Sequence, residues 1–187
     1  MNQTIWDHAA SYWELDHLGV RPWSSLPTGV TVHYTADPNF ERVKAHMLSE
    51  KVGYHFVIDR EGRVHQTASL GRCVNHAGKA MWNGQSPNRS HLAVSFLSWG
   101  QLSADSKAWN GTPVIGAVKR GGHLWDPATT AQERSLLDLL HWTMSEYGIL
   151  ASNICGHDEC ALPKGRKADP GGSLFKSVAA LRKELST

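Results

Sequence analysis

Short apolar stretches alternate with amphipathic ones along this chain, which predicts strands and helices in turn. Strands are expected where β-branched and apolar residues cluster between turn residues, at 29–35, 54–59, 63–66, 91–97 and 149–155. Helices are expected where apolar residues recur every three or four positions, at 4–16, 38–50, 130–147 and 173–185. This alternation predicts an α/β (α+β) fold, one domain over residues 1–187 with a central mixed β-sheet flanked by helices.

Local signals indicate where several of these elements begin and end. The turn at residues 60–62 is expected to join its two flanking strands into a β-hairpin. Thr130 and Glu133 have the spacing of a helix capping box, and Gly148 is placed to end that helix. Ser173 is expected to cap the last helix.

Residues 75–89 and 100–128 are rich in turn-forming residues and are predicted to be loops. The second of them would be a long irregular insertion that crosses the surface. Tryptophans lie in or beside both segments, at Trp82, Trp99, Trp109 and Trp125. They either form the floor of a glycan groove by stacking on sugar faces, or only anchor the loops.

The composition is that of a soluble globular protein, with 41% hydrophobic and 19% charged residues. A net charge of +2 gives no support for a nucleic-acid partner. No apolar run approaches the roughly 20 residues that span a bilayer. Because the N-terminus lacks the basic-then-apolar order of a signal peptide, we expect the protein to be synthesised in the cytoplasm without a signal peptide. We also expect it to be a monomer.

Three cysteines are present, Cys73, Cys155 and Cys160. An odd number without an export signal argues against a disulfide framework. Cys155 and Cys160 flank His157, so a zinc knuckle has to be considered. The second cysteine pair that such a knuckle needs is missing, and the hypothesis is not favoured.

The segment 156–171 carries most of the candidate chemistry, because it combines His157, Lys167 and Asp169 with glycines and prolines that disfavour a regular helix or strand. His33 lies near the end of a predicted strand far upstream. If that strand pairs with the one before His157, both imidazoles can reach one point. Two histidines and one carboxylate would leave a fourth zinc position open for water, as in catalytic sites. The alternative is an ordinary charged surface turn.

Several segments, in this order, resemble those of the type 2 N-acetylmuramoyl-L-alanine amidases, at residues 32–36, 53–62, 75–78, 156–159 and 165–171. That family includes phage endolysins, muropeptide-recycling amidases and the animal peptidoglycan recognition proteins. The motif core covers about residues 28 to 180. Because all the segments occur in register, the match is specific.

The resemblance implies that zinc is bound by His33, His157 and Asp169. It implies hydrolysis of the amide bond between N-acetylmuramic acid and L-alanine in peptidoglycan or muropeptides. Lys167 matches a family lysine, and its ammonium group would stabilise the oxyanion that forms on the carbonyl. Tyr54 matches a tyrosine that orients the attacking water or passes a proton, although a tyrosine packed on the core is an equal alternative.

Three further residues are candidates for substrate binding, His76, Asn88 and Arg89, with an ordinary loop role as the alternative for each. One position departs from the family pattern. In the recycling branch a strand matching residues 92–95 ends in a glutamate that serves as general base, whereas this chain has Ser95.

Three functions remain open at this stage. The chain is expected to be a phage or prophage endolysin that acts on the cell wall. The alternatives are a cytoplasmic amidase that recycles anhydro-muropeptides, and a peptidoglycan-binding module without activity. The complete set of ligands argues against the inactive module, because binding-only relatives commonly lose a ligand.

Overall fold

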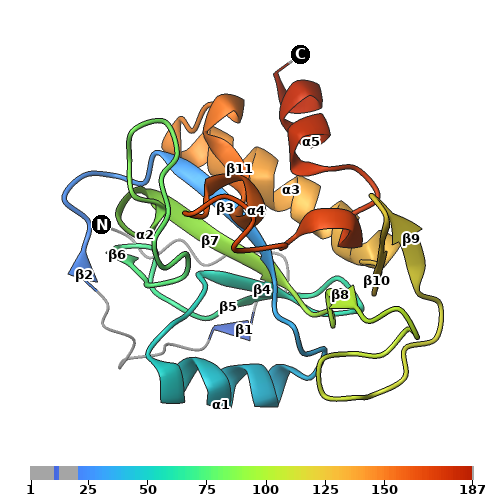
Figure 1. The fold of residues 1–187 in the computed structure, drawn as a ribbon. Coiled ribbons are helices and arrows are strands. Elements are labelled where there is room, and N and C mark those ends of the chain that lie inside the picture. Colours follow the sequence, from blue (N-terminus) through green and yellow to red (C-terminus); the bar gives the residue numbers. More distant parts are fainter. Residues whose placement is uncertain (1–10, 13–20, 187) are drawn as a thin grey trace.

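The computed structural model describes residues 11–12 and 21–186 of the chain (Figure 1). Within these residues a six-stranded sheet has the order β1-β5-β4-β7-β3-β11. Its strands are β1 (Ser11–Tyr12), β3 (Gly29–Tyr34), β4 (Phe56–Ile58), β5 (Val64–Gln66), β7 (His91–Phe96) and β11 (Ile154–Gly156). The sheet is mixed, as predicted, since β4 and β5 form an antiparallel hairpin while β4, β7, β3 and β11 run parallel.

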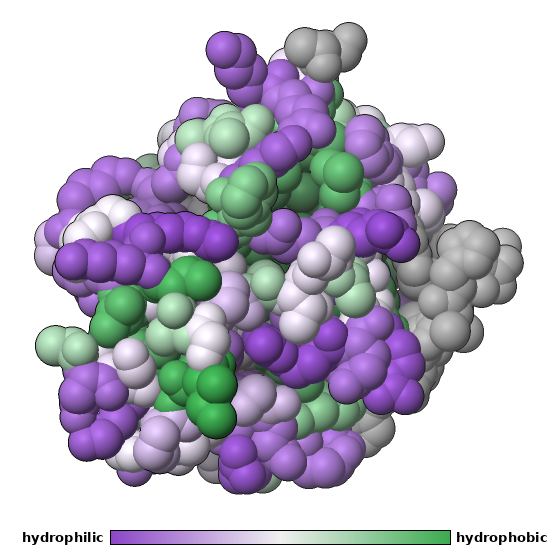
Figure 2. All heavy atoms as spheres, turned by 90° about the vertical axis from the view of Figure 1, so that its right-hand side faces the viewer, coloured by the Kyte–Doolittle hydropathy of each residue, from purple (hydrophilic) through white to green (hydrophobic). Residues whose placement is uncertain are grey.

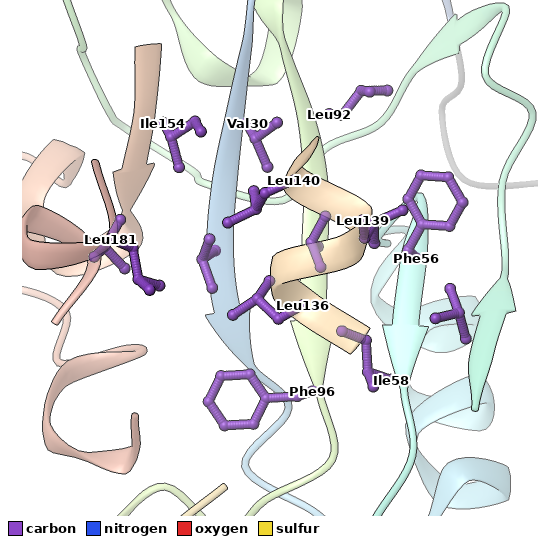
Figure 3. Packing of buried hydrophobic residues seen from close by; sticks show 14 of the residues in the cluster. Val30, Phe56, Ile58, Leu92, Phe96, Leu136, Leu139, Leu140, Ile154 and Leu181 are labelled. Atoms are coloured by element: carbon purple, nitrogen blue, oxygen red, sulfur yellow. The ribbon is translucent and has the colours of Figure 1, made fainter. Parts of the chain in front are cut away.

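Helices cover both faces of this sheet. Helix α3 (Thr130–Tyr147) and helix α5 (Val178–Leu185) pack on one face, with Leu136, Leu139 and Leu140 lying over β3, β7 and β4 (Figure 3). Helix α1 (Phe40–Glu50) packs on the other face through Val43 and Met47, which contact Val57. Alternate residues of a strand point to opposite faces, so β4 contributes to both cores.

The starts of two helices differ from the predicted ones. Helix α3 is capped by Thr129 with Gln132, and the predicted pair Thr130 and Glu133 is wrong, whereas Gly148 ends the helix as expected with φ +64°. Ser177 caps α5, and Ser173 lies instead in a short 3-10 turn, η2 (Gly171–Ser173).

The segment 100–128 is more regular than predicted. It contains a three-stranded antiparallel sheet made of β8 (Gln101–Leu102), β10 (His123–Trp125) and β9 (Val118–Arg120). The residues between β8 and β9 contain neither a helix nor a strand longer than an isolated bridge. The long insertion is therefore a small sheet that presents one extended loop.

Other short elements complete the described chain. Strands β2 (Arg21–Pro22) and β6 (Arg72–Cys73) pair, and helix α2 (Pro87–Ser90) lies in a segment predicted to be loop. The short helices η1 (Ala151–Asn153) and α4 (His157–Cys160) flank β11. The helix predicted over residues 4–16 lies outside the described residues, except for the two that form β1.

Two surface properties follow from this arrangement. On the face shown in Figure 2, hydrophobic side chains gather in small patches between hydrophilic ones, as is usual for a globular protein. Among the described helices, none has the length and apolar character needed to cross a membrane.

Gln132 ties the start of α3 to the sheet and allows a test of this packing. Its buried side chain donates to the carbonyl groups of Ile58, 3.2 Å away, and Leu97, 2.9 Å away. Gln132→Ala would leave both without this partner, and we expect the free energy of unfolding to fall by roughly 2 kcal/mol. Denaturant unfolding measures the loss. Asp138→Ala, on the exposed side of the same helix, is the control and should change stability by less than about 0.5 kcal/mol.

Candidate metal centre and cleft

The three predicted ligands meet at the carboxyl ends of two neighbouring strands. His33 lies near the end of β3, and His157 directly follows β11, which pairs in parallel with β3. Asp169 reaches the same point from the loop before η2. One ligand atom from each of the three lies within 4.8 Å of the others, and all three side chains are buried. The structure thus brings together residues more than a hundred positions apart.

The ring of His157 has a defined orientation. Its Nε2 lies 3.0 Å from the carbonyl oxygen of Ala77, and its Nδ1 lies 3.0 Å from Oδ2 of Asp169. A carbonyl oxygen only accepts hydrogen bonds, so Nε2 must carry the proton. In the neutral ring, Nδ1 therefore directs a lone pair at the carboxylate.

The ring of His33 is oriented through a second histidine. His33 Nε2 lies 3.0 Å from Nδ1 of His76, and His76 Nε2 lies 3.1 Å from the carbonyl oxygen of Pro87. That carbonyl makes His76 Nε2 a donor, so Nδ1 of a neutral His76 accepts from His33 Nε2. His33 Nδ1 is left with its lone pair 2.8 Å from Oδ2 of Asp169.

These contacts require positive charge between the rings and the carboxylate. Two neutral imidazoles would otherwise direct lone pairs at the same anionic oxygen, which is repulsive. Either a second proton on each ring or one cation among the three atoms removes the conflict. Two imidazole nitrogens and a carboxylate oxygen are suitable ligands for zinc. The residues present therefore fit the metal that the resemblance implies.

The electrostatic environment favours the ligand forms of His33 and Asp169. Burial lowers the pKa of His33, which keeps its imidazole neutral. For Asp169 burial acts to raise the pKa, but positive charge on the side of His157 and His33 that faces the carboxylate outweighs burial and holds the pKa well below its usual range. A neutral imidazole and an ionised carboxylate are the states that bind a metal.

A cleft contains the three candidate ligands and continues past His157. One part is a cavity of 690 Å³ and the other a cavity of 460 Å³. Both are lined by His46, Val52, Tyr54, His76, His157, Arg166 and Lys167. Since His33 and Asp169 line the larger cavity, a molecule bound in the cleft would reach the candidate ligands.

The two candidate catalytic residues both line this cleft. Lys167 is exposed and lies two positions before the buried Asp169. The Tyr54 ring lies 5.2 Å from the His33 ring, measured between centroids. Burial, followed by the charge of Asp169, raises the pKa of Tyr54, so its phenol stays protonated at neutral pH. Tyr54 can therefore donate a hydrogen bond but is unsuited to act as a base.

The three predicted substrate-binding residues lie in different surroundings. His76 lines the cleft, although both of its ring nitrogens contact other protein groups. Asn88 lines the smaller cavity while its side chain bonds to the backbone of residues 76–78. Arg89 is exposed and lines neither cavity of the cleft.

Ser95 lies beside the candidate ligands on the neighbouring strand. It pairs in register with His33, and its buried hydroxyl interacts with the phenol of Tyr54, where it acts to lower the pKa of Tyr54 against the larger effect of burial. A neutral side chain therefore occupies the position where the recycling relatives are expected to have a glutamate. The cleft has no carboxylate at that point.

The cysteines are not among the candidate ligands found in the described residues, although Cys160 Sγ donates to the backbone carbonyl oxygen of His157 at 3.7 Å. Cys155 and Cys160 are buried and pack in an apolar cluster with Ala77 and Ala80. The hydrogen bond with Cys160, together with burial, raises the pKa of the Cys155 thiol and keeps it protonated. Among the described residues, the group able to hold a metal includes neither cysteine, which argues against the zinc-knuckle alternative.

One cleft residue, Arg166, was not among the predicted site residues, and a second, Trp109, was predicted only as one of four tryptophans that could stack on sugars. Arg166 donates to the carbonyl oxygens of Ala77, 3.0 Å away, and Lys79, 2.9 Å away. Trp109 is 73% exposed, lines the larger cavity and donates its indole N–H to the carbonyl oxygen of Ala36, at 2.8 Å. The sequence did not distinguish Trp109 from the other three loop tryptophans, because its place in the cleft depends on how the loop folds back.

The chain resembles known proteins in sequence and in fold. It matches the N-acetylmuramoyl-L-alanine amidase family, Amidase_2, over residues 23–172, and it belongs to this family. The resemblance read from the sequence motifs is confirmed. A comparison with curated protein sequences gives no match.

Solved structures share the fold. AmiD from E. coli, in complex with a substrate of anhydro-N-acetylmuramic acid and a peptide, is 21% identical with a TM-score of 0.67. That match covers 87% of this chain but 59% of AmiD. An AmpD selenomethionine derivative is 21% identical with a TM-score of 0.64, over 97% of both chains. The endolysin amidase LysCS from Clostridium intestinale is 16% identical with a TM-score of 0.58, over 96% of this chain and 98% of its own.

Proposed function

We propose that this protein is a zinc-dependent hydrolase of the amide bond between N-acetylmuramic acid and L-alanine in peptidoglycan. The observation that carries the proposal is the convergence of His33, His157 and Asp169 on one point beside an open cleft. Membership of the amidase family supports the choice of bond. The fit of two lone pairs and one carboxylate to a cation supports the choice of zinc.

Each group in the cleft has a chemical task in this reaction. Zinc, when bound, lowers the pKa of water to about 7 and polarises a carbonyl group. The Lys167 ammonium group offers positive charge to the carbonyl oxygen as negative charge develops on it. The protonated Tyr54 phenol donates a hydrogen bond to a reacting oxygen and orients it. The burial of the three ligands keeps their orientation fixed.

The proposed substrate is the intact cell wall, cut by this protein as a phage or prophage endolysin and as a monomer. The cleft continues past the candidate ligands into a second cavity, which suits a polymer that extends beyond the bond to be cut. The alternative substrate is a soluble anhydro-muropeptide, as in the AmiD complex, whose fold this chain shares. The inactive binding module remains the third candidate, and the complete ligand set counts against it.

One experiment separates these functions. The zinc-loaded protein is incubated with purified sacculi and, separately, with soluble anhydro-muropeptides, and mass spectrometry follows release of stem peptides with a free L-alanine amine. Release from sacculi supports the endolysin. Release from the soluble substrate alone supports recycling. Binding to sacculi with no release from either substrate would contradict the proposed hydrolase.

Trp109 is expected to contribute to substrate affinity. Its exposed indole lines the cleft and is anchored through its N–H group, which suits stacking on the apolar face of a sugar. For Trp109→Ala we expect KM for muropeptide to rise roughly tenfold, with kcat nearly unchanged, since the interaction forms already in the bound substrate.

A second tryptophan provides the matched control. The indole of Trp82 bonds to the carbonyl oxygen of Ser152 and contacts the guanidinium of Arg182, and it does not line the cleft. Steady-state kinetics of Trp82→Phe should match the unsubstituted protein. Equal KM values for this variant and Trp109→Ala would exclude Trp109 from substrate binding.

A further inference from the structure

We infer that His76 and Asn88 are positioning residues for the metal centre, and that the loop at residues 76–78 sets the tautomer of both candidate histidine ligands. The inference rests on the proposed function, because it requires His33 and His157 to bind a metal through Nδ1. It assigns these loop residues a role other than contact with substrate.

The loop engages the outer nitrogen of each imidazole. His33 Nε2 contacts Nδ1 of His76 at 3.0 Å, and His157 Nε2 contacts the carbonyl oxygen of Ala77 at 3.0 Å. Consecutive loop residues therefore supply both acceptors. Each acceptor holds the ring proton on Nε2, which leaves the Nδ1 lone pair free for a cation.

The direction of the His33 contact is fixed from outside the site. His76 could accept or donate at Nδ1, but its Nε2 lies 3.1 Å from the carbonyl oxygen of Pro87. That oxygen accepts, so His76 carries its own proton on Nε2 and accepts at Nδ1. These two hydrogen bonds form a relay from His33 through His76 to the Pro87 carbonyl group of α2. The relay leaves no ring nitrogen of His76 for a substrate.

Asn88 holds the loop in place for this purpose. Its Oδ1 accepts from the backbone N–H groups of His76, 2.9 Å away, and Ala77, 2.8 Å away. Its Nδ2 donates to the carbonyl oxygen of Gly78 at 2.8 Å. One side-chain amide thus fixes three consecutive loop residues. Pro87 and Asn88 are neighbours in α2, so this one short helix orients both the ring of His76 and the carbonyl group of Ala77.

The energetic consequence is a preorganised metal site. A neutral imidazole without an outer partner divides between two tautomers, and only the Nε2–H form can bind a cation through Nδ1. Removing such an outer partner typically weakens metal binding by about 10- to 100-fold. A residue that only contacts substrate would leave metal affinity unchanged.

Two amide replacements of His76 separate its two hydrogen bonds. His76→Asn can place Oδ1 where Nδ1 was and keep an acceptor for His33, and we expect its zinc affinity to stay within about threefold of the unsubstituted protein. His76→Gln can keep a donor for the Pro87 carbonyl but not the acceptor, and we expect zinc to bind about 10- to 100-fold more weakly. Asn88→Leu should weaken zinc binding similarly. Lys79 is exposed and directly follows this loop, and Lys79→Ala should leave zinc affinity unchanged.

The measurement is transfer of zinc from each loaded protein to a chelator of known affinity, with thermal unfolding recorded beside it to confirm folding. If His76→Asn, His76→Gln and Asn88→Leu all bound zinc as tightly as the unsubstituted protein, the inference would be overturned while the proposed function stayed intact. The expected order of affinities, in a protein that cleaves neither sacculi nor muropeptides, would support the inference and contradict the proposed function. Loss of zinc in His76→Asn equal to that in His76→Gln would also overturn the relay.

Discussion

Replacing Asp169 by alanine is expected to abolish both zinc binding and amide cleavage. Its Oδ2 is the single oxygen that faces Nδ1 of His33 at 2.8 Å and Nδ1 of His157 at 3.0 Å. Without this carboxylate the group of three candidate ligands loses its one anionic member. Because the metal is worth several kcal/mol of transition-state stabilisation, turnover should fall at least about a thousandfold. The measurements are zinc per protein by elemental analysis and release of stem peptide.

A neighbouring carboxylate provides the control. Asp158 lies beside His157 on α4, and burial raises its pKa to about 6, but it is outside the group of candidate ligands. Asp158→Asn should keep zinc and activity, whereas His33→Ala and His157→Ala should lose both, as Asp169→Ala does. Full zinc content in Asp169→Ala would remove the carboxylate from the site.

Lys167→Ala is expected to keep zinc while turnover falls by roughly a hundredfold or more. Its ammonium group lines the cleft near the candidate ligands and is exposed, so its loss leaves their packing intact. Loss of one group that stabilises an oxyanion typically costs that much in kcat. The readouts are kcat for stem-peptide release and zinc content. Lys167→Arg, which keeps the positive charge, should recover part of the rate.

The nearby Lys164 distinguishes a local effect from a general change of charge. It is exposed in the same loop and donates to the carbonyl oxygen of Glu159, and it does not line the cleft. Lys164→Ala should turn over normally. Unchanged kcat in Lys167→Ala would exclude Lys167 from the mechanism, and an equal loss in both variants would make the effect non-specific.

The convergence of the candidate ligands could be expected from the sequence only on the condition that the two strands are neighbours, which the family resemblance supported and the sequence pattern did not show. His33 ends one buried strand and His157 follows another, and parallel neighbours bring such ends to one edge of a sheet. Asp169 reaches the same edge of the sheet from a loop, so no helix or strand had to be predicted for it. The central strands were predictable for the same reason, since their apolar runs are buried on both faces.

The outer contacts of the ligands could not be predicted, because they depend on how loops pack against each other. Nothing in the sequence around His76 indicates that its two nitrogens contact His33 and the Pro87 carbonyl. The cap of α3 shows the same limit. Thr129 with Gln132 and Thr130 with Glu133 both have capping-box spacing. Gln132 prevails because it also bonds to the ends of β4 and β7, a long-range contact.

The structure of the segment 100–128 was also not predictable from the sequence. Its strands are short and polar, so their pairing is set by contacts across the segment rather than by periodicity. The same folding places Trp109 in the cleft and Trp125 against Gly171 and Gly172. The sequence does not distinguish these two tryptophans, although Trp109 lines the cleft and Trp125 is buried.

X-ray absorption at the zinc edge of the purified protein tests the identity of the metal ligands most directly. Two imidazoles and one carboxylate predict a first shell of nitrogen and oxygen alone, at about 2.0–2.2 Å, with outer scattering from imidazole rings. A sulfur neighbour at about 2.3 Å would place Cys155 or Cys160 on the metal and contradict this account. A protein that retains no zinc, even after incubation with an excess of the ion, would contradict it equally.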